Sequence, residues 1–296
     1  MKRRFILLLV AAMMTTMFTI PVLADTLPVQ TGTDVTWSAT VDGTYENSMT
    51  VTRNTAWANT GLETTPWVWV STGGSTPGVF YFQQQFVLPA NAYDISGSIV
   101  ANCDNAFELS LNGNWVLGDD ASMLVPGPDT YDYRNVNIQP VVAGIVPGTN
   151  TITVHTVNYY TYANPAGLAY KLVVTYKVPT QVTVDIKPMS DPNGINNDGH
   201  GVIPVAILGS ATLDVTTINP ASVALDGMAV KFRGKSMTAQ ASYKDYNLDG
   251  YMDLIVQIED VDGAFTLGQT IGTVTGLFIN GDKFVGTDSL KIAPLL

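Results

Sequence analysis

Cysteine is almost absent from this sequence, since Cys103 is the only one among 296 residues. A single thiol excludes any intramolecular disulfide, so packing, hydrogen bonds or bound ions have to hold the fold together. Cys103 sits next to an apolar stretch, where a lone thiol usually serves as a small buried hydrophobic residue. A reactive thiol is the alternative, and we expect the buried one.

Histidine is also scarce, which removes most signatures of catalysis. The two histidines, His155 and His200, lie in different halves of the chain. Neither has a Gly-x-Ser-x-Gly nucleophile motif or a His-Glu-x-x-His zinc motif beside it. A pair of carboxylates could serve a glycosidase, but no pair stands out. The sequence therefore predicts a non-catalytic protein.

Charged residues make up only 13% of the chain, and the net charge is −11 with a pI near 4.4. An acidic field repels nucleic acid and anionic lipid and suits a solvated protein that binds cations. Beyond the N-terminus no apolar run reaches the roughly 18 residues of a membrane helix, so we expect no membrane span. Nucleic acid is excluded as a partner.

The N-terminus has the pattern of an export signal. A basic start at Lys2, Arg3 and Arg4 precedes an apolar stretch over residues 5–18, and residues 22–24 end in a small residue. This pattern predicts a signal peptide over residues 1–24 and a mature chain from Asp25. No cysteine lies near that point, so we do not expect a lipid anchor. We expect a secreted protein, extracellular or held at the cell surface by non-covalent contacts.

Composition changes near residue 178 and divides the mature chain into residues 25–178 and 179–296. All five tryptophans (37, 57, 67, 69 and 115) precede this point, whereas Asp-Gly turns dominate after it. Runs such as residues 79–88 (VFYFQQQFVL) and 151–157 (TITVHTV) alternate apolar and polar side chains. Such alternation between turn residues is typical of antiparallel sandwiches, so the sequence predicts an all-β protein with two β-sandwich domains.

Residues 245–253 (DYNLDGYMD) carry the clearest motif. Asp245, Asn247, Asp249 and Asp253 place side-chain oxygens at loop positions 1, 3, 5 and 9, the carbonyl of Tyr251 falls at position 7, and glycine occupies position 6. Hard oxygen ligands at this spacing suit Ca²⁺ better than Mg²⁺. The next residues (LIVQI) predict a strand, and Val256 stands where an EF-hand needs glutamate. We therefore expect a calcium clip between strands; an ordinary acidic hairpin turn is the alternative.

A second acidic cluster precedes this loop. It consists of Asp191, Asn193, Asn196 and Asp198. The oxygens are plentiful but irregularly spaced, and Pro192 interrupts them. A second calcium site and an ordinary polar turn both remain open here.

Aromatic residues of the first half are candidates for ligand binding. Trp57, Trp67, Trp69 and Trp115 could form a stacking platform for sugar rings, and Trp67 and Trp69 share one face of a strand. The alternative is that these side chains fill the sandwich core. Tyr159, Tyr160 and Tyr162 follow in a loop, where we expect exposed side chains that could contact a glycan or a protein.

Two resemblances extend these patterns. Residues 104–113 (DNAFELSLNG), 146–154 (VPGTNTITV) and 164–168 (NPAGL) resemble galactose-binding-like jelly rolls over roughly residues 33–177. Residues from 184 onward resemble Ig-like β-sandwich modules of bacterial and archaeal surface proteins, and the calcium loop resembles those of FG-GAP repeats. Those propellers repeat the loop in every blade, and it occurs once here, so a propeller is not expected.

The resemblances imply two hypotheses. The first is a secreted, calcium-stabilised binding protein whose first domain engages a carbohydrate or surface polymer. The second is a structural subunit of a surface layer, matrix or extracellular filament that self-associates through aromatic and strand-edge surfaces. Fold alone does not decide between them.

Overall fold

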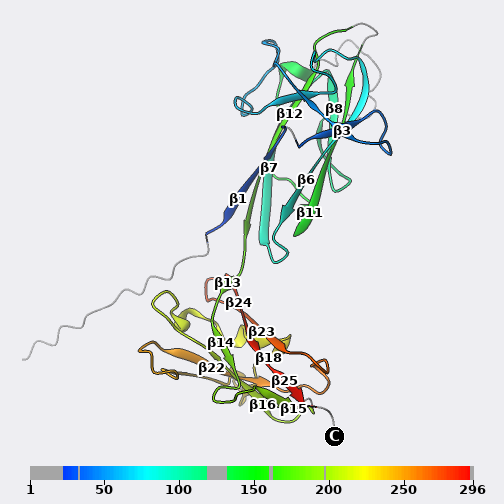
Figure 1. Ribbon diagram of the computed structural model, residues 1–296. Helices are drawn as coiled ribbons and strands as arrows, with labels where there is room; N and C mark the ends of the chain where they lie inside the picture. Colours follow the sequence, from blue (N-terminus) through cyan, green and yellow to red (C-terminus); the bar gives the residue numbers. More distant parts are fainter. Residues whose placement is uncertain (1–22, 33, 119–131, 160–162, 197, 294–296) are drawn as a thin grey trace, which may run out of the picture. The chain divides into compact units, whose positions relative to one another are not determined.

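The computed structural model describes residues 23–32, 34–118, 132–159, 163–196 and 198–293. Strands and turns build nearly all of it (Figure 1), and this confirms the predicted all-β class. Its helical segments are three-residue 3-10 turns: η2 (Asp132–Arg134), η3 (Val215–Thr217) and η4 (Pro220–Ser222). In these ranges no apolar helix reaches the length needed to cross a membrane. Contacts divide the chain into an N-terminal unit, Leu23–Val178, and a C-terminal unit from Pro179 onward.

Two antiparallel sheets form the N-terminal unit. The first, called the β12 sheet, has the order β10-β7-β12-β5-β4, with β1 also paired to β12. Its strands are β1 (Asp25–Gln30), β4 (Met49–Val51), β5 (Trp67–Trp69), β7 (Tyr93–Asp104), β10 (Asn137–Gln139) and β12 (Gly167–Lys177). The second, called the β6 sheet, has the order β3-β2-β6-β11-β8-β9. Its strands are β2 (Thr36–Ser38), β3 (Glu46–Asn47), β6 (Gly78–Leu88), β8 (Ala106–Leu111), β9 (Asn114–Gly118) and β11 (Gly148–Asn158).

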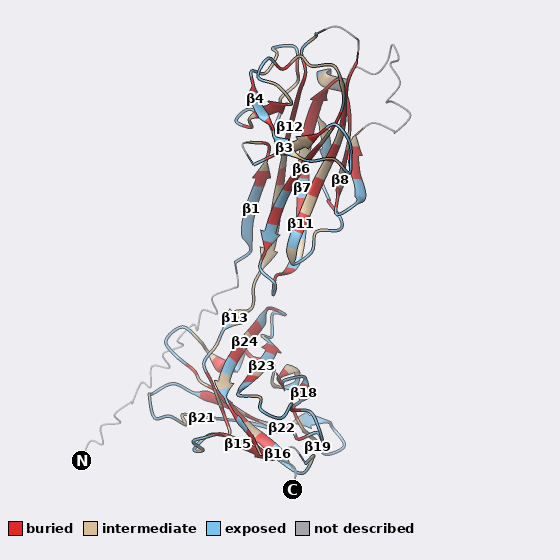
Figure 2. Ribbon diagram, turned by 45° about the vertical axis from the view of Figure 1, so that its right-hand side comes forward, coloured by how far each residue is buried: buried red, intermediate tan, exposed pale blue. Residues whose placement is uncertain are grey.

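Alternation along the long strands decides which side chains enter the core. In β6 and β11, Phe82 and Val154 are fully buried, whereas Tyr81 and His155 on the opposite face are only partly covered. The same period appears as alternating colours along these strands in Figure 2. The single thiol, Cys103, is fully buried in this core, which confirms the expectation for it. A face-to-face sandwich with one wetter face on the β6 sheet follows from this pattern.

A polar link joins the two sheets inside the sandwich. The hydroxyl of fully buried Tyr170 donates to the side-chain oxygen of Gln84 over 2.7 Å. The amide nitrogen of Gln84 donates to the Gln30 carbonyl over 3.0 Å and to an Asp34 carboxylate oxygen over 2.5 Å. Burial, with the Asp34 charge nearby, raises the pKa of Tyr170 well above its usual value. Both buried polar groups therefore have partners, as their burial requires.

The C-terminal unit is a second sandwich. Its larger sheet has the order β13-β24-β23-β17-β18, and its smaller sheet has the order β14-β16-β22-β21. The larger sheet contains β13 (Thr180–Gln181), β17 (Ala224–Leu225), β18 (Met228–Ala229), β23 (Ile271–Leu277) and β24 (Lys283–Ser289). The smaller contains β14 (Val184–Ile186), β16 (Val202–Ile207), β21 (Ala241–Lys244) and β22 (Asp253–Glu259). Two further pairs complete it: β15 (Gly194–Asn196) with β25 (Lys291–Ala293), and β19 (Phe232–Arg233) with β20 (Thr238–Ala239).

Candidate functional sites

The tryptophans do not form the platform that the sequence suggested. Trp57, Trp67 and Trp69 are 3%, 4% and 0% exposed. Trp57 packs on Trp67 with ring centroids 4.9 Å apart, and Trp69 lies 5.5 Å from Phe82. Strand β5 is buried on both faces, so the alternation of Trp67 and Trp69 does not bring them to the surface. The platform hypothesis is wrong for these three, and the alternative that they fill the core holds.

Trp115 behaves differently, because 63% of it is exposed. It lies on β9, the edge strand of the β6 sheet, opposite Ser110. A register shift between Leu109 and Ser110 inserts one extra residue in β9, and Val116 and Leu117 are both buried. Directly opposed residues of neighbouring strands share one face, so Trp115 lies on the outer face with Ser110.

A row of side chains crosses this outer face from Trp115. The pairing registers place it in the order Trp115, Ser110, Thr153, Gln83 and Thr36 over β9, β8, β11, β6 and β2. With neighbouring strands about 4.8 Å apart, Trp115 and Gln83 are about 14 Å apart. Beyond the tryptophan, the row offers hydroxyl and amide groups, which both donate and accept hydrogen bonds.

The next row contains a stacked pair. Glu108, His155 and Tyr81 oppose one another across β8, β11 and β6. The rings of Tyr81 and His155 lie parallel, with centroids 4.4 Å apart and an interplanar angle of 2°. Nδ1 of His155 lies 3.8 Å from a Glu108 carboxylate oxygen. Burial lowers the pKa of His155, although Glu108 opposes the shift, so the ring is mainly neutral at pH 7.

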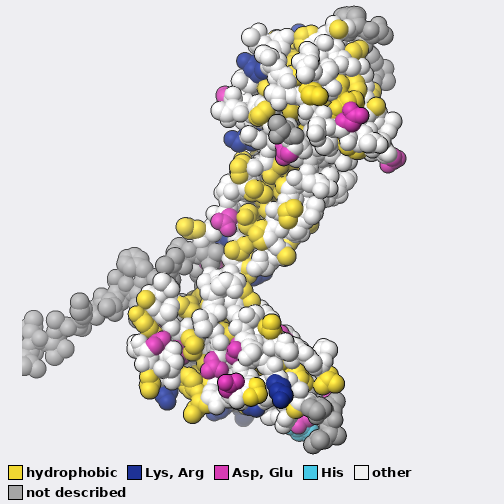
Figure 3. Space-filling model, in the orientation of Figure 1, with side chains coloured by type: hydrophobic (Ala, Val, Ile, Leu, Met, Phe, Trp, Pro, Cys, Tyr) yellow, Lys and Arg dark blue, Asp and Glu magenta, His cyan; other side chains and the backbone are white. Residues whose placement is uncertain are grey.

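These two rows define a surface that we call the β6-sheet face. It consists of Thr36, Tyr81, Gln83, Glu108, Ser110, Trp115, Thr153 and His155. None of the six strands of the sheet contains a lysine or an arginine, and their only acidic residues are Glu46 and Glu108. Figure 3 shows charged side chains scattered singly among uncharged ones on the visible side of the N-terminal unit. The face is therefore polar and nearly uncharged, with aromatic rings in it.

A small cavity lies at the end of β7. Its lining includes Asn54, Trp57, Asp104, Tyr133 and Asn164, and its volume is about 220 Å³. Asp104 is 5% exposed, and Nε1 of Trp57 donates to its Oδ2 over 2.7 Å. Its Oδ1 is buried and accepts no hydrogen bond. Burial raises the pKa of Asp104 to about 6, while the Trp57 hydrogen bond acts in the opposite direction.

The tyrosine loop next to this cavity only partly matches its prediction. Tyr159 is 4% exposed, so the expectation of an exposed contact residue is wrong for it. Its backbone N–H donates to Oδ1 of Asn105, and its carbonyl accepts from Nδ2 of Asn164, which hold this backbone inward. Tyr160 and Tyr162 lie outside the described residues.

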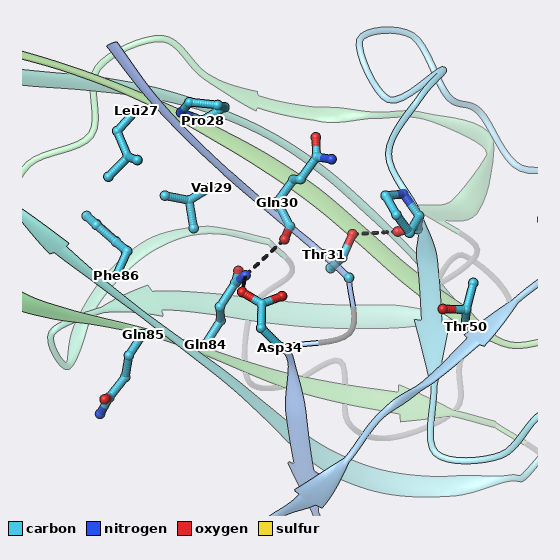
Figure 4. A pocket seen from close by; sticks show the side chains of 12 residues that line it. Leu27, Pro28, Val29, Gln30, Thr31, Asp34, Thr50, Gln84, Gln85 and Phe86 are labelled. Atoms are coloured by element: carbon cyan, nitrogen blue, oxygen red, sulfur yellow. Dashed lines mark hydrogen bonds between the residues drawn. The ribbon is translucent and has the colours of Figure 1, made fainter. Parts of the chain in front are cut away.

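A larger groove of about 570 Å³ opens between β1 and β6, where the two sheets separate. Figure 4 shows Leu27, Val29 and Phe86 on one side of the Gln84 link and Asp34 and Thr31 near it. The N–H of Thr31 donates to the Tyr170 carbonyl on β12. Backbone polar groups along β1 face β12 at alternate residues, so those of residue 28 point away from β12 toward the open edge. That residue is Pro28, which has no N–H and blunts this free edge against strand addition.

The loop at residues 245–253 is a tight turn with two kinds of carboxylate. Asp249 accepts from the N–H of Tyr251 over 2.9 Å, and Asp245 accepts from the N–H of Gly250 over 3.1 Å. Oδ1 of Asp245 is buried without a hydrogen bond. Gly250 has φ near +94°, which suits glycine at the predicted turn position.

Asp253 uses both carboxylate oxygens to hold backbone N–H groups. It is fully buried at the start of β22, where Oδ1 accepts from the N–H of Gly209 over 2.8 Å and Oδ2 from the N–H of Tyr246 over 2.7 Å. In the ranges that the structure describes, no three His, Cys, Asp or Glu side chains are arranged to hold a metal ion. Asp253 thus has a structural role in holding the backbone, and its role as a calcium ligand stays a prediction.

The members of the second acidic cluster face different neighbours. The amide of Asn193 donates to Oδ2 of Asp288 and to the Ser289 carbonyl, each over 2.9 Å. Asp198 accepts from the N–H of His200 over 3.1 Å. Asp191 and Asn196 are exposed. Asn193 thus has a structural task, and a second calcium site at these residues stays a prediction.

Sequence reasoning missed Tyr81, Glu108, His155 and Asp104 as candidate site residues. The alternation of residues 79–88 and 151–157 contains the signal for Tyr81 and His155, because it assigns the odd-numbered positions to one face. Their alignment across strands depends on the register, which alternation alone does not give. Asp104 carried no such signal, since its burial follows from loops distant in sequence.

No protein-family model and no curated protein matches the sequence. Among solved structures, the chain is similar to a β-glucuronidase from Ruminococcus gnavus in complex with N1-substituted uronic isofagomine, with a TM-score of 0.32, 9% identity, and coverage of 95% of this chain and 48% of that chain. It is also similar to an FMN-binding β-glucuronidase from Facaelibacterium prausnitzii, with a TM-score of 0.32, 10% identity, and coverage of 91% and 40%. This chain thus spans less than half the length of either enzyme.

A third similar structure is a family 35 carbohydrate binding module from Clostridium thermocellum, with a TM-score of 0.28 and 15% identity. The match covers 49% of this chain and 97% of that module. Similarity at this distance concerns the β-sandwich architecture and carries no information on function.

Proposed function

We propose that this protein is a secreted, non-catalytic carbohydrate-binding protein whose C-terminal unit is stabilised by calcium. The observation that carries the proposal is the exposed Trp115 at the end of a row of hydroxyl and amide side chains on the β6-sheet face. Secretion is supported by the signal pattern over residues 1–24.

The chemistry of the β6-sheet face suits a neutral polysaccharide. An aromatic ring can pack against the C–H face of a sugar ring, as it does on other apolar surfaces. Hydroxyl and amide side chains such as Ser110, Thr153 and Gln83 can exchange hydrogen bonds with sugar hydroxyls. Glu108 and the absence of lysine and arginine from the six strands disfavour sulfated or uronic acid polymers.

Calcium fits the loop at residues 245–253 with a smaller ligand set than the spacing suggested. Asp245, Asn247 and Asp249 would supply side-chain oxygens, and Tyr251 would supply its carbonyl. The Oδ1 atom of Asp245 is buried and accepts no hydrogen bond, which supports a cation as its partner. A bound calcium ion would neutralise the acidic side chains and cross-link the turn between β21 and β22. Asp253 would position the loop backbone without touching the ion.

The test compares Trp115→Ala with Val141→Ala, a control that removes another exposed hydrophobic side chain (71% exposed) outside the β6 sheet. We expect saturable retention of the parent on neutral polysaccharides by affinity electrophoresis. Loss of one stacking contact, worth about 0.5–1.5 kcal/mol, should raise the Kd of Trp115→Ala roughly two- to tenfold. Unchanged binding by Trp115→Ala, or equal loss in Val141→Ala, would exclude the β6-sheet face.

Sizing chromatography on the same samples tests the alternative hypothesis of a structural subunit. That hypothesis requires concentration-dependent assembly.

A further inference from the structure

The cavity at the end of β7 contains a carboxylate without a matching charge. Only 5% of Asp104 is exposed, and its Oδ1 accepts no hydrogen bond. Burial raises its pKa against the opposing effect of the Trp57 hydrogen bond, and no neighbouring charge contributes. With a pKa of about 6 the group is mainly ionised at pH 7. A buried, ionised and unpaired carboxylate is costly, so it marks a place where a partner is expected.

Arg53 precedes the lining residue Asn54 in the chain, and its guanidinium is already engaged. Arg53 donates from Nη1 to the carbonyls of Asn54 and Trp57, which orders the loop that forms one wall of the cavity. Asn105 and Asn164 use their side chains to hold the backbone of Tyr159. Donors from the protein therefore surround the cavity without reaching Oδ1 of Asp104. The missing donor has to come from solvent or from a ligand.

The size and walls of the cavity limit what that ligand can be. A volume of 220 Å³ lies below the roughly 300–1,000 Å³ of pockets for drug-sized molecules, so it admits one small molecule or one terminal sugar residue. Trp57 and Tyr133 provide aromatic walls, and Asn54 and Asn164 provide amides. A calcium ion needs six to eight oxygen ligands, whereas the cavity has a single carboxylate and its Asn105 oxygen is occupied.

We propose that this cavity binds the ammonium group of an amino sugar, with Asp104 as the counter-ion and the surrounding amides as partners for the sugar hydroxyls. An ammonium group donates charge-assisted hydrogen bonds to a carboxylate, which are about twice as strong as neutral ones. Aromatic side chains beside the carboxylate add favourable interactions with a cation. The site shares no residue with the β6-sheet face, so it stands or falls independently of the proposed binding of neutral polysaccharide.

Three matched sugars test the proposal by calorimetry on the full chain at pH 7. D-glucosamine carries the ammonium group, D-glucose replaces it by a hydroxyl, and N-acetyl-D-glucosamine replaces it by a neutral amide. We expect glucosamine to bind at least tenfold more tightly than the other two, because a hydrogen bond between two charged groups is stronger than one between neutral groups. Equal affinities for the three sugars, or no binding of glucosamine, would overturn the proposal. Calcium added during the titration should not compete, and competition would point to a metal site instead.

Asp104→Asn keeps an oxygen that can accept from Trp57 and removes the charge. We expect this variant to lose at least tenfold in affinity for glucosamine. Asp94→Asn is the control, since Asp94 lies on the same strand, β7, but pairs with Lys177 over 3.4 Å at an exposed position. Equal loss in both variants would show that the overall negative charge attracts the amine, and this too would overturn the proposal. Melting curves of both variants verify that they fold.

Discussion

Asp104 owes its raised pKa to its place in the fold, not to a charged neighbour. It ends β7, where Trp57 covers one carboxylate oxygen and leaves the other without a donor. His155 shows the same effect in a base, because burial lowers its pKa even though Glu108 lies 3.8 Å away. In both residues burial disfavours the charged form and outweighs the local partner. Desolvation therefore sets the protonation of both candidate sites of the N-terminal unit.

The raised pKa of Asp104 makes stability depend on pH in a defined window. The folded protein binds the proton more tightly than the unfolded chain, whose aspartate titrates near 3.8. The stabilisation is fully present below about pH 4 and is lost as the pH rises through about 6. The shift from 3.8 to about 6 corresponds to about 3 kcal/mol. We expect the parent to lose most of this, about 2.4 kcal/mol, between pH 4 and pH 7 relative to Asp104→Asn, measured by urea unfolding.

Other titrating groups cancel in this comparison, since both proteins contain them. The difference in unfolding free energy between Asp104→Asn and the parent should rise with pH and level off above about pH 7. A difference that is flat from pH 4 to pH 7 would mean that Asp104 titrates normally and is open to solvent.

At the scale of single residues, sequence reasoning gives type and spacing but not surroundings. Tryptophan composition correctly identified the N-terminal half as the aromatic one, yet only Trp115 among the four candidates is exposed. Trp57 is buried because Trp67, ten residues later, packs on its ring, and no local pattern contains that contact. Exposure of large aromatic side chains is decided by tertiary packing and has to be read from the fold.

The acidic residues of the turn between β21 and β22 have two different roles, although their sequence spacing suggests a single role as calcium ligands. Asp245, Asn247 and Asp249 lie in the turn, where their oxygens can face a cation. Asp253 begins β22 and binds backbone N–H groups of Gly209 and Tyr246. Spacing fixes which residues lie in the loop, but the direction of each carboxylate depends on the neighbouring chain at Gly209. Strand β22, by contrast, follows from its β-branched composition and was predictable.

Substitution of Asp249 and of Asp253 should therefore have different calcium dependence. With a Kd on the order of 10⁻⁴–10⁻³ M, 10 mM calcium would stabilise the parent by about 1.4–2.7 kcal/mol. Asp249→Ala should lose this stabilisation with little effect in chelator, because its side chain is exposed. Asp253→Ala should lose about 3 kcal/mol or more in either condition, since buried N–H groups lose a charged acceptor.

Thermal unfolding of both variants in calcium and in chelator measures this contrast. Asp42→Ala, an exposed aspartate of the N-terminal unit, serves as the control for removal of one charge. Identical melting of the parent with calcium and with chelator would refute the calcium clip and leave the acidic hairpin turn as the explanation of the loop.

The two large hydrophobic clusters of the described residues are separate from each other. The buried residues of one cluster lie between Val29 and Val174, and those of the other lie between Val184 and Ile292, with no residue in common. Strand β12 ends at Lys177 and β13 begins at Thr180, so only two residues join them. The change in composition near residue 178 was visible in the sequence because each core selects its own residues: large aromatic side chains in the first, mainly aliphatic ones in the second. A chain with one core per unit should fold as two units.

Separate expression of residues 25–178 and 179–296 tests this division together with the assignment of functions. Each fragment should unfold in one cooperative transition, because each retains a complete core and both of its sheets. Calcium at 10 mM should raise the Tm of fragment 179–296 by about 5–10 °C and leave that of fragment 25–178 unchanged. Retention on neutral polysaccharide should remain with fragment 25–178. Retention by fragment 179–296 would move the binding surface to the C-terminal sandwich, and a calcium effect on fragment 25–178 would require an ion site in the N-terminal one.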